Sequence, residues 1–145
     1  EDYDAVMHIN LRAAYFLSTA AAAKMMGQGG SIIHISSQMG HVGGPNRSLY
    51  CASKWALEGM NKAFALDLAG RGIRSNTIAP TFIETPMTRP FFEDAAFKAS
   101  VLAKIKLGRL GKVEDLMGAV VFLASDDAGF ITGSTISANG GQYMM

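Results

Sequence analysis

Short apolar segments that are rich in β-branched residues alternate with long helical segments along this chain. The β-rich segments cover residues 31–35, 73–78 and 132–138, and helical patterns cover residues 3–26 and 48–69. Apolar runs of this kind are typical of strands that are buried on both faces of a parallel sheet. The alternation therefore predicts an α/β fold, in which helices cover a parallel sheet.

The two long helical patterns have recognisable ends. Three glycines, Gly27, Gly29 and Gly30, follow the first pattern, and Gly70 follows the second. Ser48 is expected to be the N-cap of the second helix. Weaker helical character extends over residues 91–105, and a further helix is predicted over residues 113–125. Both long helices are apolar on more sides than one sheet covers, so we expect them to be buried on more than one side.

The chain contains no repeat, low-complexity stretch or linker, so residues 1–145 are expected to form a single unit. Three strands make a small sheet for two such apolar helices. Parallel strands with two apolar faces need neighbours on each side. Because the first residue is Glu1 rather than methionine, we expect the chain to begin in mid-protein. At least one edge of its sheet would then pair with further polypeptide.

Composition excludes several classes of protein. The 13 basic and 12 acidic residues are interspersed, which argues against a nucleic-acid partner. The longest apolar stretches, such as residues 118–124, are too short to span a bilayer, so no membrane association is expected. The only cysteine, Cys51, cannot form an internal disulfide and fits a reducing compartment, which favours a cytoplasmic protein. The three histidines lack metal-ligand spacing, and no metal site is predicted.

A tyrosine and a lysine lie one helical turn apart at the start of the second long helix. Tyr50 and Lys54 are separated by four residues, which places them on one face of the helix. A phenol ordinarily loses its proton near pH 10, but a neighbouring ammonium group stabilises the phenolate. This pair is therefore a candidate general acid/base for chemistry that interconverts a hydroxyl and a carbonyl. Taken alone, the pair more often belongs to an ordinary amphipathic helix.

Ser37 strengthens the functional interpretation, because it lies thirteen residues before Tyr50 at the end of the first predicted strand. Ligands bind at the carboxyl edge of open α/β sheets, so a hydroxyl there can contact a substrate oxygen. By itself, a serine at a strand end is usually a local cap. His41 follows in the same loop, and we expect it to be a surface histidine rather than part of a substrate pocket.

These residues resemble the short-chain dehydrogenase/reductase family. The resemblance rests on Ile35-Ser36-Ser37 followed by Tyr50-Cys51-Ala52-Ser53-Lys54, which reproduce the family's serine and its Tyr-x-x-x-Lys motif at this separation. It extends from residue 1 to about residue 142. Further matching segments are His8-Ile9-Asn10-Leu11, Ala79-Pro80-Thr81-Phe82-Ile83-Glu84-Thr85, Gly108-Arg109, Phe122-Leu123-Ala124-Ser125, Ile131-Thr132-Gly133 and Asn139-Gly140-Gly141.

The resemblance implies a role for each matching residue. Tyr50 would be the catalytic acid/base, and Lys54 would assist it and hold the ribose hydroxyls of the nicotinamide cofactor. Ser37 would polarise the substrate oxygen, and Asn10 would support a water that links Lys54 to solvent. The backbone of Ile83 and the side chain of Thr85 would bind the nicotinamide carboxamide, in a loop that Pro80 shapes. The implied cofactor is NAD or NADP, and the implied reaction is hydride transfer to or from a secondary alcohol or ketone.

The sequence departs from the family's pattern in two places. Thr81 stands where the family has glycine, which tightens the space near the nicotinamide. The family's glycine-rich phosphate turn has no counterpart, and Gly27-x-Gly29 is not a dinucleotide fingerprint because Ile32 stands where its third glycine should fall. The resemblance therefore identifies these residues as the C-terminal part of a Rossmann-like doubly wound parallel sheet. The N-terminal cofactor-binding half would be absent.

Two functions of different classes follow from this assignment. The first is an NAD(P)-dependent oxidoreductase, in which residues 1–145 alone would be inactive. The alternative is a truncated, inactive product that acts only as a dimerisation or interaction module. In either case the resemblance implies a homodimer or homotetramer formed through helices 3–26 and 48–69. A hydrolase that uses Ser37 is disfavoured, because the chain contains no Gly-x-Ser-x-Gly motif.

The substrate is a small alcohol or ketone that the sequence does not identify. Residues 86–107 correspond to the family's variable substrate loop. Phe91, Phe92 and Phe97 lie within it and predict an apolar lid over the site.

Overall fold

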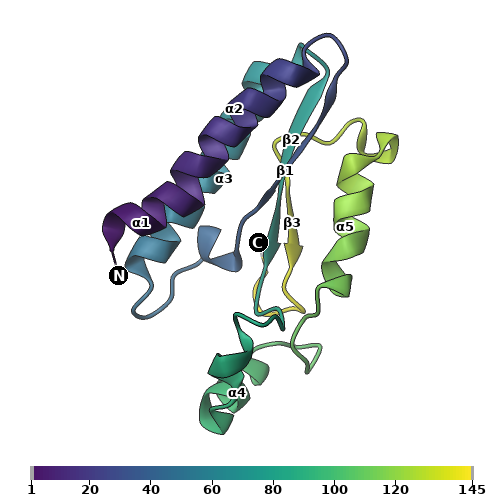
Figure 1. Cartoon of the computed structure of the whole chain (residues 1–145). Coiled ribbons are helices and arrows are strands. Elements are labelled where there is room, and N and C mark those ends of the chain that lie inside the picture. The colour runs from purple at the N-terminus through teal and green to yellow at the C-terminus, as the bar shows by residue number, and fades with distance from the viewer. Residues whose placement is uncertain (1, 145) are drawn as a thin grey trace.

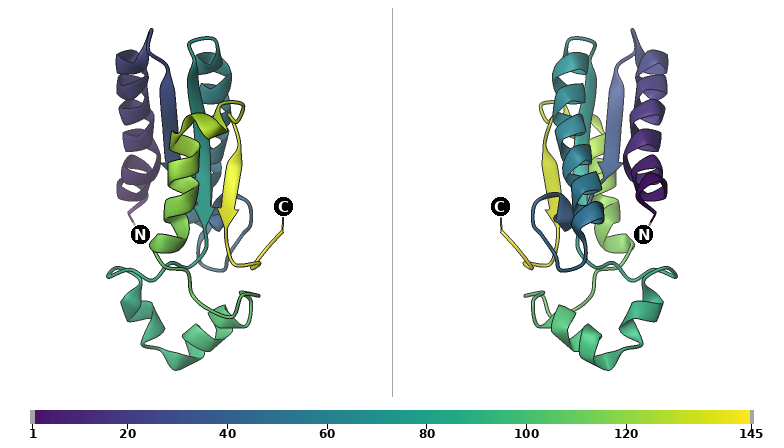
Figure 2. Two further views of the ribbon diagram at one scale, coloured as in Figure 1. Left: turned by 90° about the vertical axis from the view of Figure 1, so that its right-hand side faces the viewer. Right: turned by 90° about the vertical axis from the view of Figure 1, so that its left-hand side faces the viewer.

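A parallel sheet lies between two layers of helices in the computed structural model, which describes residues 2–144. Helices α1, α2 and α3 cover one face of the sheet, and α5 covers the other (Figures 1 and 2). The chain order is α1 (Tyr3–Met7), the π-helical turn η1 (His8–Arg12), α2 (Ala13–Met25), β1 (Gly30–Ile35), η2 (Gln38–Gly40), α3 (Ser48–Ala69), β2 (Ile73–Pro80), η3 (Arg89–Phe92), α4 (Ala95–Leu102), α5 (Glu114–Ala124), η4 (Asp126–Ala128) and β3 (Thr135–Ala138).

The sheet has the strand order β1-β2-β3, and both pairs of neighbouring strands are parallel. Gly30 lies opposite Ile73, and Thr77 lies opposite Thr135. The carboxyl ends of the strands therefore meet at one edge of the sheet, as the three arrows of Figure 1 show. The segments after β1 and β2, which carry most of the predicted site residues, leave the sheet at this edge.

Two apolar clusters hold the helices to the sheet. Ala22, Ile32, Leu68 and Ile73 form the cluster that joins α2 and α3 to β1 and β2. On the opposite face, Ile78 and Leu123 are both fully buried and join β2 to α5. Between residues 2 and 144, no helix is both long and apolar enough to cross a membrane. The α/β parallel architecture predicted from the alternation of apolar segments is confirmed.

The helix ends differ from two of the sequence predictions. Ser48 is the first residue of α3, and Arg47 occupies the cap position without a side-chain cap hydrogen bond, so the prediction of a Ser48 cap is wrong. Gly70 follows α3, but its backbone is right-handed. Gly72 instead has a φ of 70°, and its carbonyl accepts a hydrogen bond from the Gly30 amide at 3.1 Å. The turn that leads into β2 is therefore fixed by its contact with β1.

Two predicted segments are shorter in the structure than in the sequence analysis. The weakly helical stretch is divided into η3 and α4, because the Asp94 carboxylate caps α4 by accepting from the amides of Ala96 and Phe97. Strand β3 begins at Thr135 rather than at Thr132. The Thr132 hydroxyl accepts a hydrogen bond from a β2 amide, at 3.1 Å, in place of strand pairing.

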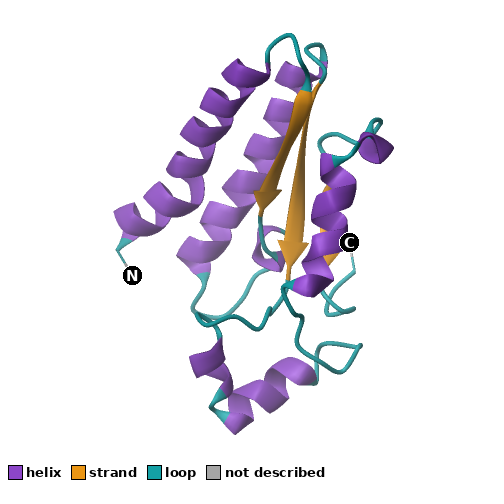
Figure 3. Ribbon diagram, turned by 45° about the vertical axis from the view of Figure 1, so that its right-hand side comes forward, coloured by secondary structure: helices purple, strands orange, loops and turns teal. Residues whose placement is uncertain are grey.

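The outer edge of β1 has no partner strand among the described residues. Figure 3 shows β1 beside β2 at this side of the sheet, with α2 beyond it. Ile35, at the end of β1, is 51% exposed although it is apolar. An unpaired edge with an exposed apolar side chain is a place where a further strand can pair, and that pairing stays a prediction.

Candidate active site

Tyr50 and Lys54 lie together on the first two turns of α3, as their spacing predicts. The ammonium nitrogen of Lys54 lies 5.8 Å from the centre of the Tyr50 ring. The same nitrogen donates a hydrogen bond of 3.0 Å to the carbonyl oxygen of Ile35, which anchors it at the end of β1. Burial lowers the pKa of Lys54 below its ordinary value, although the charge of Glu58 acts in the opposite direction. A positive charge is thus held beside the phenol by the sheet itself.

Ser37 is buried at the point where the chain leaves β1. Its hydroxyl oxygen accepts a hydrogen bond of 3.1 Å from the amide of Met39 and so caps the short turn η2. The turn packs against α3, which brings Ser37 to the helix that carries Tyr50. Because the oxygen acts here as an acceptor, the hydroxyl hydrogen stays available for a substrate oxygen.

Asn10 lies in the π-helical turn η1 rather than in a regular α-helix. Its amide group donates a hydrogen bond of 3.1 Å to the Ser53 hydroxyl, which in turn donates to the Tyr50 carbonyl at 2.8 Å. Asn10 and Lys54 also line one groove between α2 and β1. Asn10 is therefore tied to the start of α3, and single π-helical turns of this kind are frequent at functional sites.

Pro80 is the last residue of β2, and the loop follows directly after it. Ile83 forms an isolated parallel bridge with Gly111, and its carbonyl accepts a hydrogen bond of 2.6 Å from the Thr88 hydroxyl. The Ile83 amide has no hydrogen-bond partner within residues 2–144. The Thr85 hydroxyl lies 3.1 Å from the hydroxyl of Thr88. Hydrogen bonds within the loop thus hold its conformation, while the Ile83 amide remains available as a donor.

The predicted site residues form two groups. Tyr50, Lys54, Ser37 and Asn10 gather around the start of α3. Pro80, Ile83 and Thr85 follow the neighbouring strand at the same edge of the sheet, and no hydrogen bond joins the two groups among the described residues. Ligands of open α/β sheets bind at this edge, outside the carboxyl ends of the strands.

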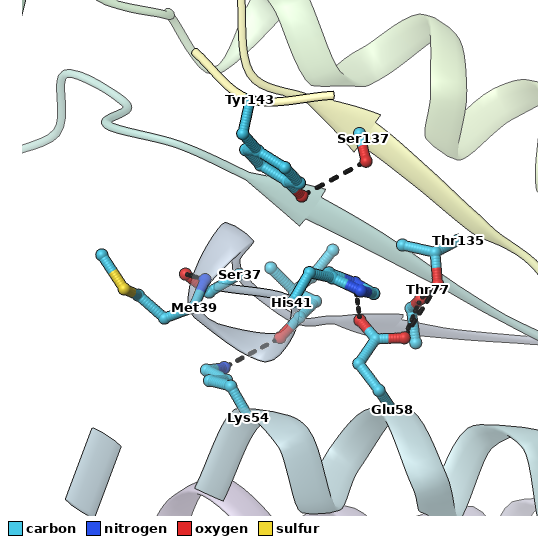
Figure 4. A network of polar contacts seen from close by, with 10 residues as sticks. Ser37, Met39, His41, Lys54, Glu58, Thr77, Thr135, Ser137 and Tyr143 are labelled. Atoms are coloured by element: carbon cyan, nitrogen blue, oxygen red, sulfur yellow. Dashed lines mark hydrogen bonds and ion pairs between the residues drawn. The ribbon is translucent and has the colours of Figure 1, made fainter. Parts of the chain in front are cut away.

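A buried carboxylate on α3 was not predicted from the sequence. Glu58 is 4% exposed, and one of its oxygens accepts hydrogen bonds from the hydroxyls of Thr77, at 2.9 Å, and Thr135, at 2.8 Å. Its other oxygen lies 3.2 Å from the ring nitrogen Nε2 of His41 (Figure 4). Burial alone would raise the pKa of Glu58, but the hydroxyls of Ser36, Thr135 and Thr77 and the nearby His41 lower it below its ordinary value. The carboxylate therefore joins α3 to β2, to β3 and to the loop after β1.

His41 is not the surface histidine that was expected. Its ring nitrogen is buried against Glu58, and its ring stacks on Tyr143, with the ring centres 6.3 Å apart. The available sequence signal was helical spacing, since Tyr50, Lys54 and Glu58 follow one another at intervals of four residues. A carboxylate on the same face as the catalytic pair was thus visible in the sequence, but its partners were not.

Two of the three phenylalanines for which an apolar lid was predicted, in residues 86–107, pack together, and the lid over the site stays a prediction. Phe92 and Phe97 stack with their ring centres 6.0 Å apart, and both meet the ring of Phe82 edge to face. Phe91 is 54% exposed and lies outside this aromatic cluster. Within the described residues, no group of three or more His, Cys, Asp or Glu is placed to hold a metal ion.

Residues 1–142 match the family model described as Enoyl-(Acyl carrier protein) reductase. The chain is 43% identical over 145 residues to the 3-oxoacyl-(acyl-carrier-protein) reductase FabG of Haemophilus influenzae, a match that covers 99% of this chain and 59% of that protein. The chain thus spans about three fifths of the length of this relative.

Two solved structures have closely similar folds. The gluconate 5-dehydrogenase of Burkholderia cenocepacia, in complex with NADP and tartrate, superposes with a TM-score of 0.94 at 34% identity, covering 97% of this chain and 56% of that one. A 4-hydroxyisoleucine dehydrogenase complexed with NADH superposes with a TM-score of 0.93 at 33% identity, covering 98% of this chain and 60% of that one.

Proposed function

This chain belongs to the short-chain dehydrogenase/reductase family, and from that premise we propose that it is the catalytic portion of an NAD(P)-dependent oxidoreductase. The reaction is hydride transfer between a nicotinamide and a secondary alcohol or ketone, with Tyr50 as general acid/base. The observation that supports this most directly is the Lys54 ammonium, which the Ile35 carbonyl holds 5.8 Å from the centre of the Tyr50 ring.

The nicotinamide end of the cofactor fits the residues present. The unpartnered Ile83 amide is a donor for the carboxamide, and Thr85 lies two residues further along the same loop. Lys54 supplies a cation for the ribose hydroxyls. When bound, the cofactor supplies or accepts the hydride. Two solved structures of similar fold are complexes with NADP and with NADH, and titration with both cofactors distinguishes between them.

The chain's own residues handle the proton and the substrate oxygen. Ser37 donates its hydroxyl hydrogen to the substrate oxygen, because its own oxygen is already fixed by the Met39 amide. Tyr50 gives its phenolic proton to that oxygen in reduction and takes it back in oxidation. Lys54 stabilises the phenolate, and Asn10 supports the exchange of the proton with solvent through a water near Lys54.

We further propose that residues 1–145 are the C-terminal part of a larger Rossmann-fold domain. The groove that Asn10 and Lys54 share lies beside β1, whose outer edge lacks a strand among the described residues. Apolar residues such as Leu17 and Ile33 line the rest of the groove. A strand from an N-terminal cofactor-binding half would pair with β1 there and cover these side chains.

A cofactor titration tests the proposed function. NADH and NADPH are titrated into two proteins, the full protein that carries these residues and the 145-residue chain alone. We expect micromolar binding of at least one cofactor to the full protein only. Dinucleotides gain most of their contacts at a glycine-rich turn and helix N-terminus, which this chain lacks. Turnover is then measured with a panel of secondary alcohols and ketones.

The results of this titration distinguish the proposed oxidoreductase from the alternative, an inactive dimerisation module. Circular dichroism of the short chain controls for loss of fold. Binding of either cofactor to the short chain would contradict the assignment of the cofactor half to residues outside it. A full protein that assembles but binds neither cofactor would indicate the alternative, a module whose only function is dimerisation.

We also propose that the protein is a homodimer or homotetramer that associates through α2 and α3. Phe16 on α2 and Leu66 on α3 are 58% and 83% exposed, and Trp55 on α3 is 54% exposed. Exposed apolar side chains concentrated on two adjacent helices indicate an interaction surface. Closed two-fold symmetry is the usual way in which identical chains cover such a surface.

Sedimentation of the full protein at micromolar concentration measures this association. We expect a dimer or tetramer, and we expect Leu66→Glu to shift it towards monomer because the substitution places a charge in the apolar contact. Met87→Glu is the matched control, since Met87 is 82% exposed but lies in the loop after β2. A wild-type protein that sediments as a stable monomer would contradict the proposal.

A further inference from the structure

A cleft opens at the carboxyl edge of the sheet, next to Ser37. One of its walls is the segment that follows Ser37, including Gln38 and Met39, and the opposite wall is helix α4. Arg47, three residues before Tyr50, and Tyr143 near the C-terminus also line it. Figure 4 shows Met39 next to Ser37, and Tyr143 near Ser137 on the side away from Lys54. A substrate whose carbonyl contacts Ser37 would therefore extend into this cleft.

The cleft has positive charge and no negative charge among its lining residues. Arg47 and Lys104 both line it, and the lining contains no aspartate or glutamate. Neither cation forms an ion pair in the described part of the chain, where the two ion pairs are His41–Glu58 and Arg109–Asp115. The Asp94 carboxylate, at the N-cap of α4, accepts hydrogen bonds from the amides of Ala96 and Phe97 and does not line the cleft. Two unpaired cations in one concave site attract an anion.

The rest of the lining fits a small polar molecule with an apolar stem. Gln38 and Gln142 supply amide groups, and Phe97 and Val101 of α4 supply an apolar wall. Gln142 is held in place, since the Thr81 hydroxyl donates to its side-chain oxygen. That bond leaves the side-chain NH₂ of Gln142 available as a donor, which complements the two cations.

We infer that the substrate of this site is an anionic ketone or alcohol, whose carboxylate or phosphate is held by Arg47 and Lys104 while its carbonyl lies at Ser37 and Tyr50. The inference rests on the proposed oxidoreductase function, because it places the anion relative to the reacting carbonyl. Arg47 and Lys104 are specificity-determining residues in this arrangement. They select the substrate by charge and take no part in proton or hydride transfer.

Two matched pairs of ketones test this inference with the cofactor-loaded full protein. Acetoacetate is compared with methyl acetoacetate, and dihydroxyacetone phosphate with dihydroxyacetone. Each compound is titrated by calorimetry and assayed as a substrate. We expect the anion of at least one pair to bind roughly tenfold more tightly than its neutral partner, as two partly exposed ion pairs allow. The pair that shows the preference distinguishes a carboxylate from a phosphate.

The double variant Arg47→Gln/Lys104→Gln should remove this preference by raising the KM for the anion roughly tenfold, with little change in KM for the neutral partner. Lys98→Gln, on α4 but outside the cleft lining, should retain it. Equal binding of anion and neutral partner in both pairs, or a preference that survives in the double variant, would overturn the inference. Absence of turnover with every compound would count against the proposed reaction instead, since the binding comparison does not depend on turnover.

Discussion

Replacing Tyr50 with phenylalanine is expected to lower kcat by roughly 10²- to 10⁴-fold, the usual contribution of a positioned general acid/base. The aromatic ring remains, and so does its contact with the Lys54 ammonium. Only the transferable proton is lost. Cofactor affinity should therefore change little, which a fluorescence titration of NADH or NADPH measures alongside kcat.

Two other variants show whether the effect is specific. Tyr3→Phe is the matched control, because Tyr3 is 64% exposed at the N-terminal end of α1. Lys54→Met should reduce both kcat and cofactor affinity, since Lys54 is proposed to assist Tyr50 and to hold the cofactor ribose. A Tyr50→Phe protein with kcat near that of the wild type would show that another group transfers the proton.

Replacing Glu58 with alanine is expected to destabilise the protein by roughly 3 kcal/mol. A hydrogen bond to a charged group contributes about 1.5–3 kcal/mol, and the substitution removes two of them from a buried site. The fully buried Thr77 hydroxyl would also lose one of its two partners, although it keeps its contact with Thr135. Urea denaturation measures the change in the free energy of unfolding.

The Glu58 network also predicts a dependence of stability on pH. Because the pKa of Glu58 is lowered in the folded protein, its stabilising effect is fully present above the ordinary value of about 4.5. It is lost as the pH falls below that value, through the lowered pKa. Glu58→Gln should therefore show a smaller loss of stability in this acidic range than the wild type.

Glu93→Ala is the control for both measurements, because Glu93 is exposed and forms no ion pair within residues 2–144. It should change the free energy of unfolding by no more than about 0.5 kcal/mol. If Glu58→Ala were equally neutral, the buried carboxylate would not be what joins α3 to the sheet.

Local patterns were sufficient to predict the architecture and the placement of the candidate residues at the end of β1 and the start of α3. The alternation of β-rich and helical segments predicted the parallel sheet, because period and apolar content are properties of consecutive residues. The predicted helix over residues 48–69 matches α3, and its four-residue spacing predicted the contact between Lys54 and Tyr50. Ser37 was found in the same way, since the end of a buried strand is visible in the sequence.

Contacts between distant segments were decided by the tertiary structure alone. Thr77, Thr135 and His41 come from three segments that meet only when the sheet forms, so no spacing could reveal Glu58 as their common partner. A distant contact also explains why β3 begins later than the sequence predicted. The Thr132 hydroxyl accepts a hydrogen bond from an amide of β2. A cap, a turn or an ion pair depends on which groups the fold brings within hydrogen-bond distance.

The two cations of the cleft also show the difference between what local sequence patterns reveal and what only the folded chain brings together. In the sequence, Arg47 and Lys104 are ordinary basic residues of a chain with a net charge of only +1. Their joint position in one cleft follows from the packing of α4 beside the segment after β1. The sequence by itself therefore determined the fold class and the contact between Tyr50 and Lys54, which depend on local spacing. The tertiary structure decided which charges gather in this cleft, because an electrostatic field is the sum over groups that only the folded chain brings together.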